Sequence, residues 1–165
     1  MNIKRITKHL LLTHWQVNRA FPSNSLAAID RAIKASEAAH AGEIRFAVEG
    51  ALDGTPLFTG QSAKDRALEV FSQLRIWDTE HNNGVLIYLL LADRDVEIVA
   101  DRGIHSKVGS QAWEKICREM ETAFRQANYE SGVVSGVRAV TQHLSKHFPA
   151  SGSSRNELPD KPVVL

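Results

Sequence analysis

Hydrophobic positions recur along this chain at two spacings, and each spacing predicts a different element. Leu26, Ile29 and Ile33 follow one another at helical intervals, so they predict an amphipathic helix. From residue 43 to residue 49, apolar residues alternate with charged ones, which predicts a half-buried strand. The change of spacing indicates that a helix gives way to a strand at Gly42.

Two later segments predict further strands. The run VLIYLLL, residues 85–91, is continuously apolar, which favours a strand covered on both faces at the centre of a sheet. The segment VEIVA, residues 96–100, alternates again and follows the short polar connection ADRD. We therefore expect these two strands to form a hairpin.

Helical spacing and capping signals predict five helices. They cover an amphipathic segment before Pro22, residues 25–40 with Ser25 as N-cap, residues 63–75, a segment from Ser110, and a last segment that ends at HFP. The fourth helix carries Trp113 and Cys117 on its apolar face, so both are predicted to be core residues. The intervening stretch GALDGTPLFTGQS is rich in turn formers and is predicted to be an exposed loop.

The fold class predicted from these elements is α/β, with a small mixed sheet of three to four strands between helices. With 165 residues and 43% apolar content, the chain can bury one core. We expect an N-terminal amphipathic helix over residues 1–22, an α/β domain over 23–149 and a flexible polar tail over 150–165. The closing VVL of that tail is apolar enough to add a strand to an exposed sheet edge.

Charge and hydropathy limit the partners. Twenty basic and nineteen acidic residues give a net charge of +1, without a run of either sign that would favour nucleic acid. No stretch approaches the roughly 20 apolar residues of a membrane span. The sequence thus predicts no nucleic-acid partner and no transmembrane segment of its own. The expected location is the cytoplasm, with peripheral attachment to the inner membrane as the alternative.

Polar residues gather at one predicted end of the sheet. Antiparallel pairing of the two hairpin strands would bring Glu80, Asn83 and Asp101 to the same edge. Open sheets often bind ligands at strand ends, so these three residues are the candidate metal or ligand site. No catalytic residue and no other cofactor-binding residue stands out.

Glu37 and His40 form a second candidate cluster, because the Glu-x-x-His spacing places both on one helix face. Two alternatives remain open for this pair. It could hold a metal, or it could be a helix end whose histidine favours the C-terminal dipole and whose glutamate is solvated. A single copy of the motif favours the helix end, since di-iron carboxylate bundles need a second copy and further glutamates.

Three segments, NNGVLIY, ADRGI and FRQANYESGVVSGV, follow one another in this order along the chain. Together they resemble the TPM domain family, whose name joins a thylakoid lumen protein, a photosystem II repair protein and an acetylcholine-receptor modulator. The resemblance extends from Leu26 to Phe148. It implies an α/β sandwich, calcium binding, weak phosphatase activity in one plant branch, and genetic association with LemA-type membrane proteins in bacteria.

The chain departs from this family at FPSNS, where typical members have an aspartate before the first helix. Loss of a carboxylate removes both charge and an oxygen ligand from a calcium site. We therefore expect no cofactor, or weakly bound Ca²⁺.

Two functions follow as hypotheses. The first is a non-enzymatic binding or scaffolding module that acts with a membrane-associated, LemA-like partner. The alternative is a metal-assisted, phosphatase-like hydrolase with a carboxylate-lined cleft. The first is favoured because no group of residues supplies a nucleophile, an acid and a cation together.

Overall fold

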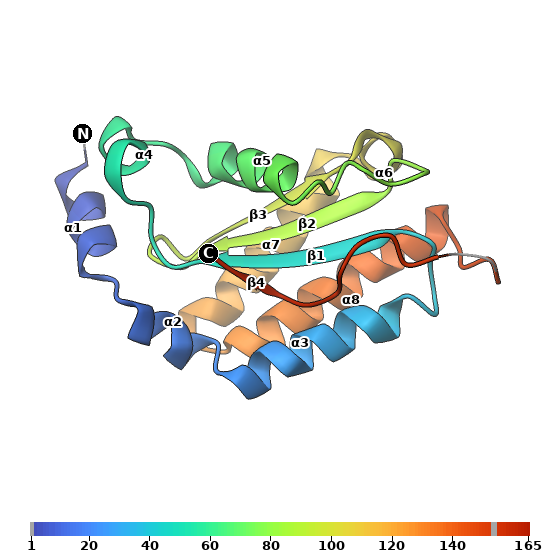
Figure 1. Ribbon diagram of the computed structural model, residues 1–165, viewed down its shortest axis with the longest axis horizontal. Helices are drawn as coiled ribbons and strands as arrows, with labels where there is room; N and C mark the ends of the chain where they lie inside the picture. The colour runs from blue at the N-terminus through green and yellow to red at the C-terminus, as the bar shows by residue number, and fades with distance from the viewer. Residues whose placement is uncertain (1, 153–154) are drawn as a thin grey trace.

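The computed structural model describes residues 2–152 and 155–165, and in this part of the chain a four-stranded mixed sheet lies between helices (Figure 1). The strand order is β3–β2–β1–β4. The two central strands are parallel, β3 runs antiparallel to β2, and β4 runs parallel to β1. The strands are β1 (Glu43–Glu49), β2 (Gly84–Leu90), β3 (Asp95–Ala100) and β4 (Val163–Val164). The predicted α/β class is confirmed.

Helices cover both faces of the sheet, and the remaining ones lie near its two ends (Figure 1). One face packs against α3 (Ser23–Ser36), α7 (Ser110–Arg125) and α8 (Tyr129–His147). The other face packs against α4 (Gly54–Thr59) and α5 (Ala63–Gln73). At the end of the sheet where β2 turns into β3 lie α1 (Ile3–Leu11) and α2 (His14–Ala20), and at the opposite end lies α6 (Arg102–Val108).

Alternate residues of the central strands fill two cores. Phe46 and Ile87 point into the larger core beneath α3, α7 and α8, whereas Ala47 and Tyr88 point into the smaller core beneath α4 and α5. This alternation places β2 at the centre of the sheet, as its apolar run predicted. Trp113 and Cys117 are buried, so their prediction as core residues is confirmed.

Several predicted helices differ from the observed ones. The predicted first helix is two helices, because the Thr13 N–H donates to Gln16 Oε1 and starts α2 afresh. The second predicted helix begins at Ser23, with Pro22 rather than Ser25 as N-cap, and ends at Ser36. Short helices, α4 and α6, occupy segments that the sequence indicated as connections. Each is too short to show a helical repeat of apolar residues.

The prediction that β1 is half-buried is wrong, because all seven of its residues are buried. Its charged side chains are covered by partners far away in the sequence. The Glu49 carboxylate binds the Arg66 guanidinium through two hydrogen bonds of 2.8 and 2.9 Å and accepts a third from the Tyr88 hydroxyl. Arg45 donates to the carbonyl of Pro159 in the tail.

Residues 155–165 of the C-terminal tail lie along the outer edge of β1. Glu43 Oε1 accepts a hydrogen bond from the Glu157 N–H, and the Leu165 N–H donates to Val48 O. Val163 and Val164 pair with Ala47 and Val48. The closing apolar residues therefore add a strand to the chain's own sheet.

Candidate functional site

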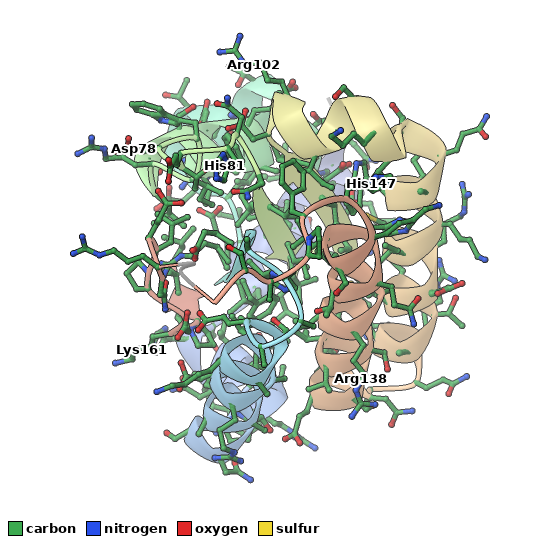
Figure 2. All side chains as sticks on the ribbon, turned by 90° about the vertical axis from the view of Figure 1, so that its right-hand side faces the viewer. Asp78, His81, Arg102, Arg138, His147 and Lys161 are labelled. Atoms are coloured by element: carbon green, nitrogen blue, oxygen red, sulfur yellow. The ribbon has the colours of Figure 1, made fainter. Side chains whose placement is uncertain are left out.

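The amino end of β2, which we call the closed end, holds the three residues predicted as a site. Asn83 precedes β2 and Asp101 follows β3, and the antiparallel register brings their backbones together, since the Asp101 N–H donates to Gly84 O at 2.9 Å. Glu80 lies in the loop before β2 with an exposed side chain, and its N–H donates to the Glu157 carboxylate at 3.0 Å. Figure 2 looks onto this end, with Asp78 and Arg102 projecting at its margin.

Most polar groups of Asn83 and Asp101 are used within the fold. Asn83 is fully buried, its Nδ2 donates to Ala41 O at 3.1 Å, and its N–H donates to Thr79 Oγ1 at 3.1 Å. Asp101 is the N-cap of α6 and accepts from the Arg102 N–H at 2.7 Å. Within the described residues, only Asn83 Oδ1 and Asp101 Oδ2 remain as buried acceptors without a hydrogen-bond partner at this end.

These two oxygens do not make a calcium site. Calcium takes about six to eight oxygen ligands. Across the described ranges, no group of three or more His, Cys, Asp or Glu side chains is placed to hold a metal ion. The donor set of the closed end therefore does not fit calcium.

Glycines pack the closed end tightly. A Cβ at Gly84 would collide with the carbonyl of Ile76, and one at Gly103 would collide with the carbonyls of His81 and Asn82. Backbone therefore occupies the space next to β2 that a ligand would need.

Glu37 and His40 lie near this end, just beyond α3, and His40 has a place in the fold. The ring is buried, its Nδ1–H donates to Gly42 O at 2.9 Å, and its Nε2 lies 3.2 Å from Ser36 Oγ. Burial lowers the pKa of His40, so the ring is neutral at pH 7. With both nitrogens engaged, His40 orders the turn between α3 and β1.

Glu37 belongs instead to a carboxylate cluster beneath the tail. Its Oε1 accepts from Asn156 Nδ2 at 2.9 Å, and that amide also donates to Asp160 at 3.0 Å. Burial, followed by the hydrogen bond and charge of Asp160, raises the pKa of Glu37 to about 7. Burial also raises the pKa of Glu43 to about 6. A cavity of about 340 Å³ separates α3 from the tail here.

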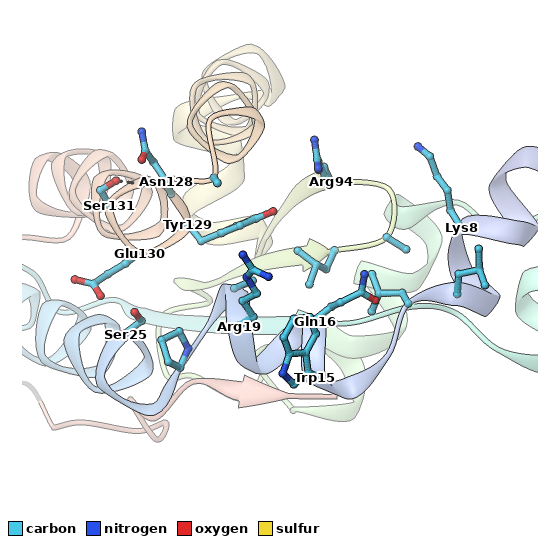
Figure 3. Close-up of a pocket in the computed structure, with 17 residues that line it drawn as sticks. Lys8, Trp15, Gln16, Arg19, Ser25, Arg94, Asn128, Tyr129, Glu130 and Ser131 are labelled. Carbon is cyan, nitrogen blue, oxygen red and sulfur yellow. Dashed lines mark hydrogen bonds between the residues drawn. The ribbon is translucent and has the colours of Figure 1, made fainter.

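The opposite end of the sheet, which we call the open end, holds a much larger groove of about 1160 Å³ (Figure 3). Three exposed cations border it, each from a different element: Lys8 of α1, Arg19 of α2 and Arg94 of the β2–β3 turn. Glu130 is the one acidic residue among its described lining. Its other lining residues are Leu11, Leu12, Trp15, Gln16, Ala20, Pro22, Ser25, Leu91, Ala92, Ala127, Asn128, Tyr129 and Ser131.

The groove also includes the segment FPSNS, through Pro22 and Ser25. Where a calcium-binding relative would need a carboxylate, this chain has a proline and serines beside three cations. Positive charge disfavours a divalent cation, so the donors here do not fit calcium either.

The sequence reasoning missed this end. Its signals were present, since Lys8, Arg19 and Arg94 are scattered cations without an ion-pair partner in the described part of the chain. Arg19 of α2 and Arg94 of the turn are 75 residues apart in the sequence, so only the fold brings these cations together.

The comparisons with known proteins agree with this architecture. The TPM domain family matches residues 18–143. The BA42 protein of the psychrophilic bacterium Bizionia argentinensis is 30% identical, and its NMR structure superposes with a TM-score of 0.76 over 88% of this chain and 95% of that one. The N-terminal domain of a P. gingivalis protein is 23% identical, with a TM-score of 0.62 over 79% of this chain and 83% of that one, which shows likeness of fold. No curated protein matches. The family match covers most of the chain, and the chain therefore belongs to the TPM domain family.

Proposed function

We propose that this chain is a non-enzymatic binding module that acts with a membrane-associated, LemA-like partner, and that it binds this partner through the groove at the open end. The observation that carries the proposal is the groove itself. It is large and exposed, and three cations stand around it without carboxylate partners in the described chain. Such a surface favours an acidic segment of a partner protein, because charge complementarity sets both orientation and association rate.

The residues available for chemistry support binding over hydrolysis. At the closed end, the Asn83 amide donates to the carbonyl of Ala41, and the Asp101 carboxylate caps α6. The single cysteine, Cys117, is buried, and burial raises the pKa of its thiol to about 12. Since the thiolate is the reactive form, Cys117 is not a nucleophile at neutral pH.

The test is binding of the purified chain to the LemA-like protein of the same organism, held in nanodiscs. Double charge reversal, Arg19→Glu with Arg94→Glu, should weaken binding at least about tenfold, because it replaces attraction by repulsion. The matched control is Arg138→Glu, an exposed arginine of α8 on a surface away from the groove (Figure 2). This variant should bind like the unmodified chain.

A phosphatase assay tests the hydrolase alternative. The chain should not hydrolyse p-nitrophenyl phosphate with Mg²⁺, Mn²⁺ or Ca²⁺. Turnover that disappears in Asp101→Asn and Glu80→Gln would replace the binding module by a metal-assisted hydrolase at the closed end.

A further inference from the structure

Helix α1 is amphipathic, but its polar side faces the protein. Arg5 Nε lies 2.8 Å from Asp93 Oδ2 in the β2–β3 turn, and Arg5 Nη2 donates to Gln61 O at 2.9 Å. His9, one turn further along the helix, is only 3% exposed. An arginine and a histidine therefore make the polar contacts that attach α1 to the domain.

The ring of His9 has a hydrogen-bond partner on one side and a carboxylate close by on the other. Its Nδ1 accepts from the Leu52 N–H at 2.9 Å, so in the neutral ring Nε2 carries the proton. Nε2 lies 3.1 Å from Asp93 Oδ1. The Asp93 carboxylate thus contacts both Arg5 and His9, and these contacts determine which side of α1 faces the domain.

The apolar side of α1 consequently faces away from the domain. Ile3, Leu10 and Leu11 are 71%, 65% and 70% exposed, and Trp15 at the start of α2 is 64% exposed. Ile6 is the one apolar residue of α1 that packs against the smaller core. A helix that docks on its own domain normally buries its apolar stripe. These exposed side chains belong to α1 and α2, which lie at the end of the sheet where β2 turns into β3 (Figure 1).

The charged residues of the segment that carries these side chains have one sign. Residues 1–29 contain four cations, Lys4, Arg5, Lys8 and Arg19, and the first acidic residue of the sequence is Asp30. Asp93 binds Arg5, whereas Lys4, Lys8 and Arg19 are exposed. The Arg19 guanidinium lies 5.4 Å from the centre of the Trp15 ring, where it adds a cation next to the largest exposed side chain.

We propose that the outward face of α1, together with Trp15, binds an anionic membrane surface. Large aliphatic side chains and a tryptophan flanked by several cations are typical of helices that lie in the lipid interface. Glu130 is the one carboxylate that lines the groove with Leu11 and Trp15, so cations prevail around them. The inference rests on the proposed function, because it supplies the membrane contact at which a membrane-associated partner would be met.

The test is co-sedimentation of the whole chain with phosphatidylcholine vesicles, with and without about 30 mol% phosphatidylglycerol. The chain should bind the anionic vesicles, and added salt should weaken the binding because the cations contribute. The double variant Leu10→Ser with Leu11→Ser should lose at least about tenfold in partitioning, because it removes two of the four large apolar side chains of this surface. The matched control is Leu68→Ser, at a leucine of α5 that is 48% exposed, and this variant should bind like the unmodified chain.

Equal binding by the Leu10/Leu11 variant, or no binding to anionic vesicles, would overturn the proposal. Concentration-dependent dimerisation that the same variant abolishes would also overturn it, in favour of a contact between two copies. Circular dichroism melts of both variants separate loss of fold from loss of binding. Binding of the LemA-like partner is measured in phosphatidylcholine nanodiscs, with nanodiscs that lack the partner as the baseline. Binding to the partner is then distinguished from binding to anionic lipid, so either idea can fail while the other stands.

Discussion

The two ends of strand β2 differ in what their polar residues do. At the closed end, Asn83 is buried and Asp101 is partly buried, and both bind backbone groups, of Ala41 and of Arg102 respectively. At the open end, Lys8, Arg19 and Arg94 surround a groove and are exposed. Polar residues at a strand end are therefore a guide to a binding site only when the fold leaves their hydrogen-bonding groups free.

Gly84→Ala, at the closed end, is the substitution expected to destabilise the fold most. The new methyl group would press on the Ile76 carbonyl, and backbone must move to admit it. We expect a loss of about 3 kcal/mol in the free energy of unfolding, measured by urea denaturation. Lys8→Ala at the open end should change stability by less than about 0.5 kcal/mol. Equal effects at both ends would remove the contrast.

Asn83→Ala tests whether the buried amide is structural. It leaves the Ala41 carbonyl without its donor, so we expect a loss of about 2 kcal/mol by the same denaturation measurement. Calcium at millimolar concentration should leave the melting temperature of the unmodified chain nearly unchanged. A calcium-dependent rise that Asn83→Ala abolishes would mean that the closed end is a metal site after all.

Asp93→Ala probes how α1 is held beside the open end. It removes the acceptor of Arg5 and leaves the buried Nε2–H of His9 without its carboxylate. We expect about 1 kcal/mol of destabilisation and faster tryptic cleavage after Lys4 and Lys8. Unchanged cleavage would indicate that α1 is held by other contacts, and Asp53→Ala, in the exposed segment before α4, is the matched control.

The smallest expected effect is a pH dependence confined to the closed end. The pKa of Glu37 is raised from 4.5 to about 7, by burial first and by Asp160 second. The folded chain therefore holds more protons than the unfolded chain between about pH 4.5 and 7, so this group's contribution to stability is present below that window and is lost as pH rises through it.

The sharper measurement is the difference in the free energy of unfolding between Glu37→Gln and the unmodified chain. From pH 5 to pH 8, the stability of the variant should rise relative to that of the unmodified chain. Taking the difference cancels the opposite contribution of His40, whose lowered pKa reduces stability as pH falls through about 6.5. Glu119→Gln, exposed on α7, should show no such trend.

The sequence predicted the elements that depend on local pattern. The apolar run of residues 85–91 identified the central strand, and the hairpin register placed Asn83 and Asp101 at one end. It could not predict that the Asn83 amide is engaged, because its acceptor Ala41 O comes from the distant turn between α3 and β1. The groove was missed for a similar reason, since its cations lie on elements far apart in the chain.

The orientation of α1 could not be predicted from its amphipathic pattern either. The spacing of apolar residues predicts that a helix has two sides, but the side that faces the domain depends on Asp93 and Leu52, far from the helix in the sequence. For β1, likewise, the alternation was read correctly as a strand, while its burial depends on the tail and on Arg66.

The pairing of β4 with β1 has a consequence for synthesis of the chain. The edge of β1 emerges from the ribosome more than a hundred residues before Val163 and Val164 can cover it. During that interval, the nascent protein can already form its first three strands while one sheet edge stays unpaired. Since an unpaired edge can pair with another chain, β4 protects β1 from edge-to-edge association once it is in place.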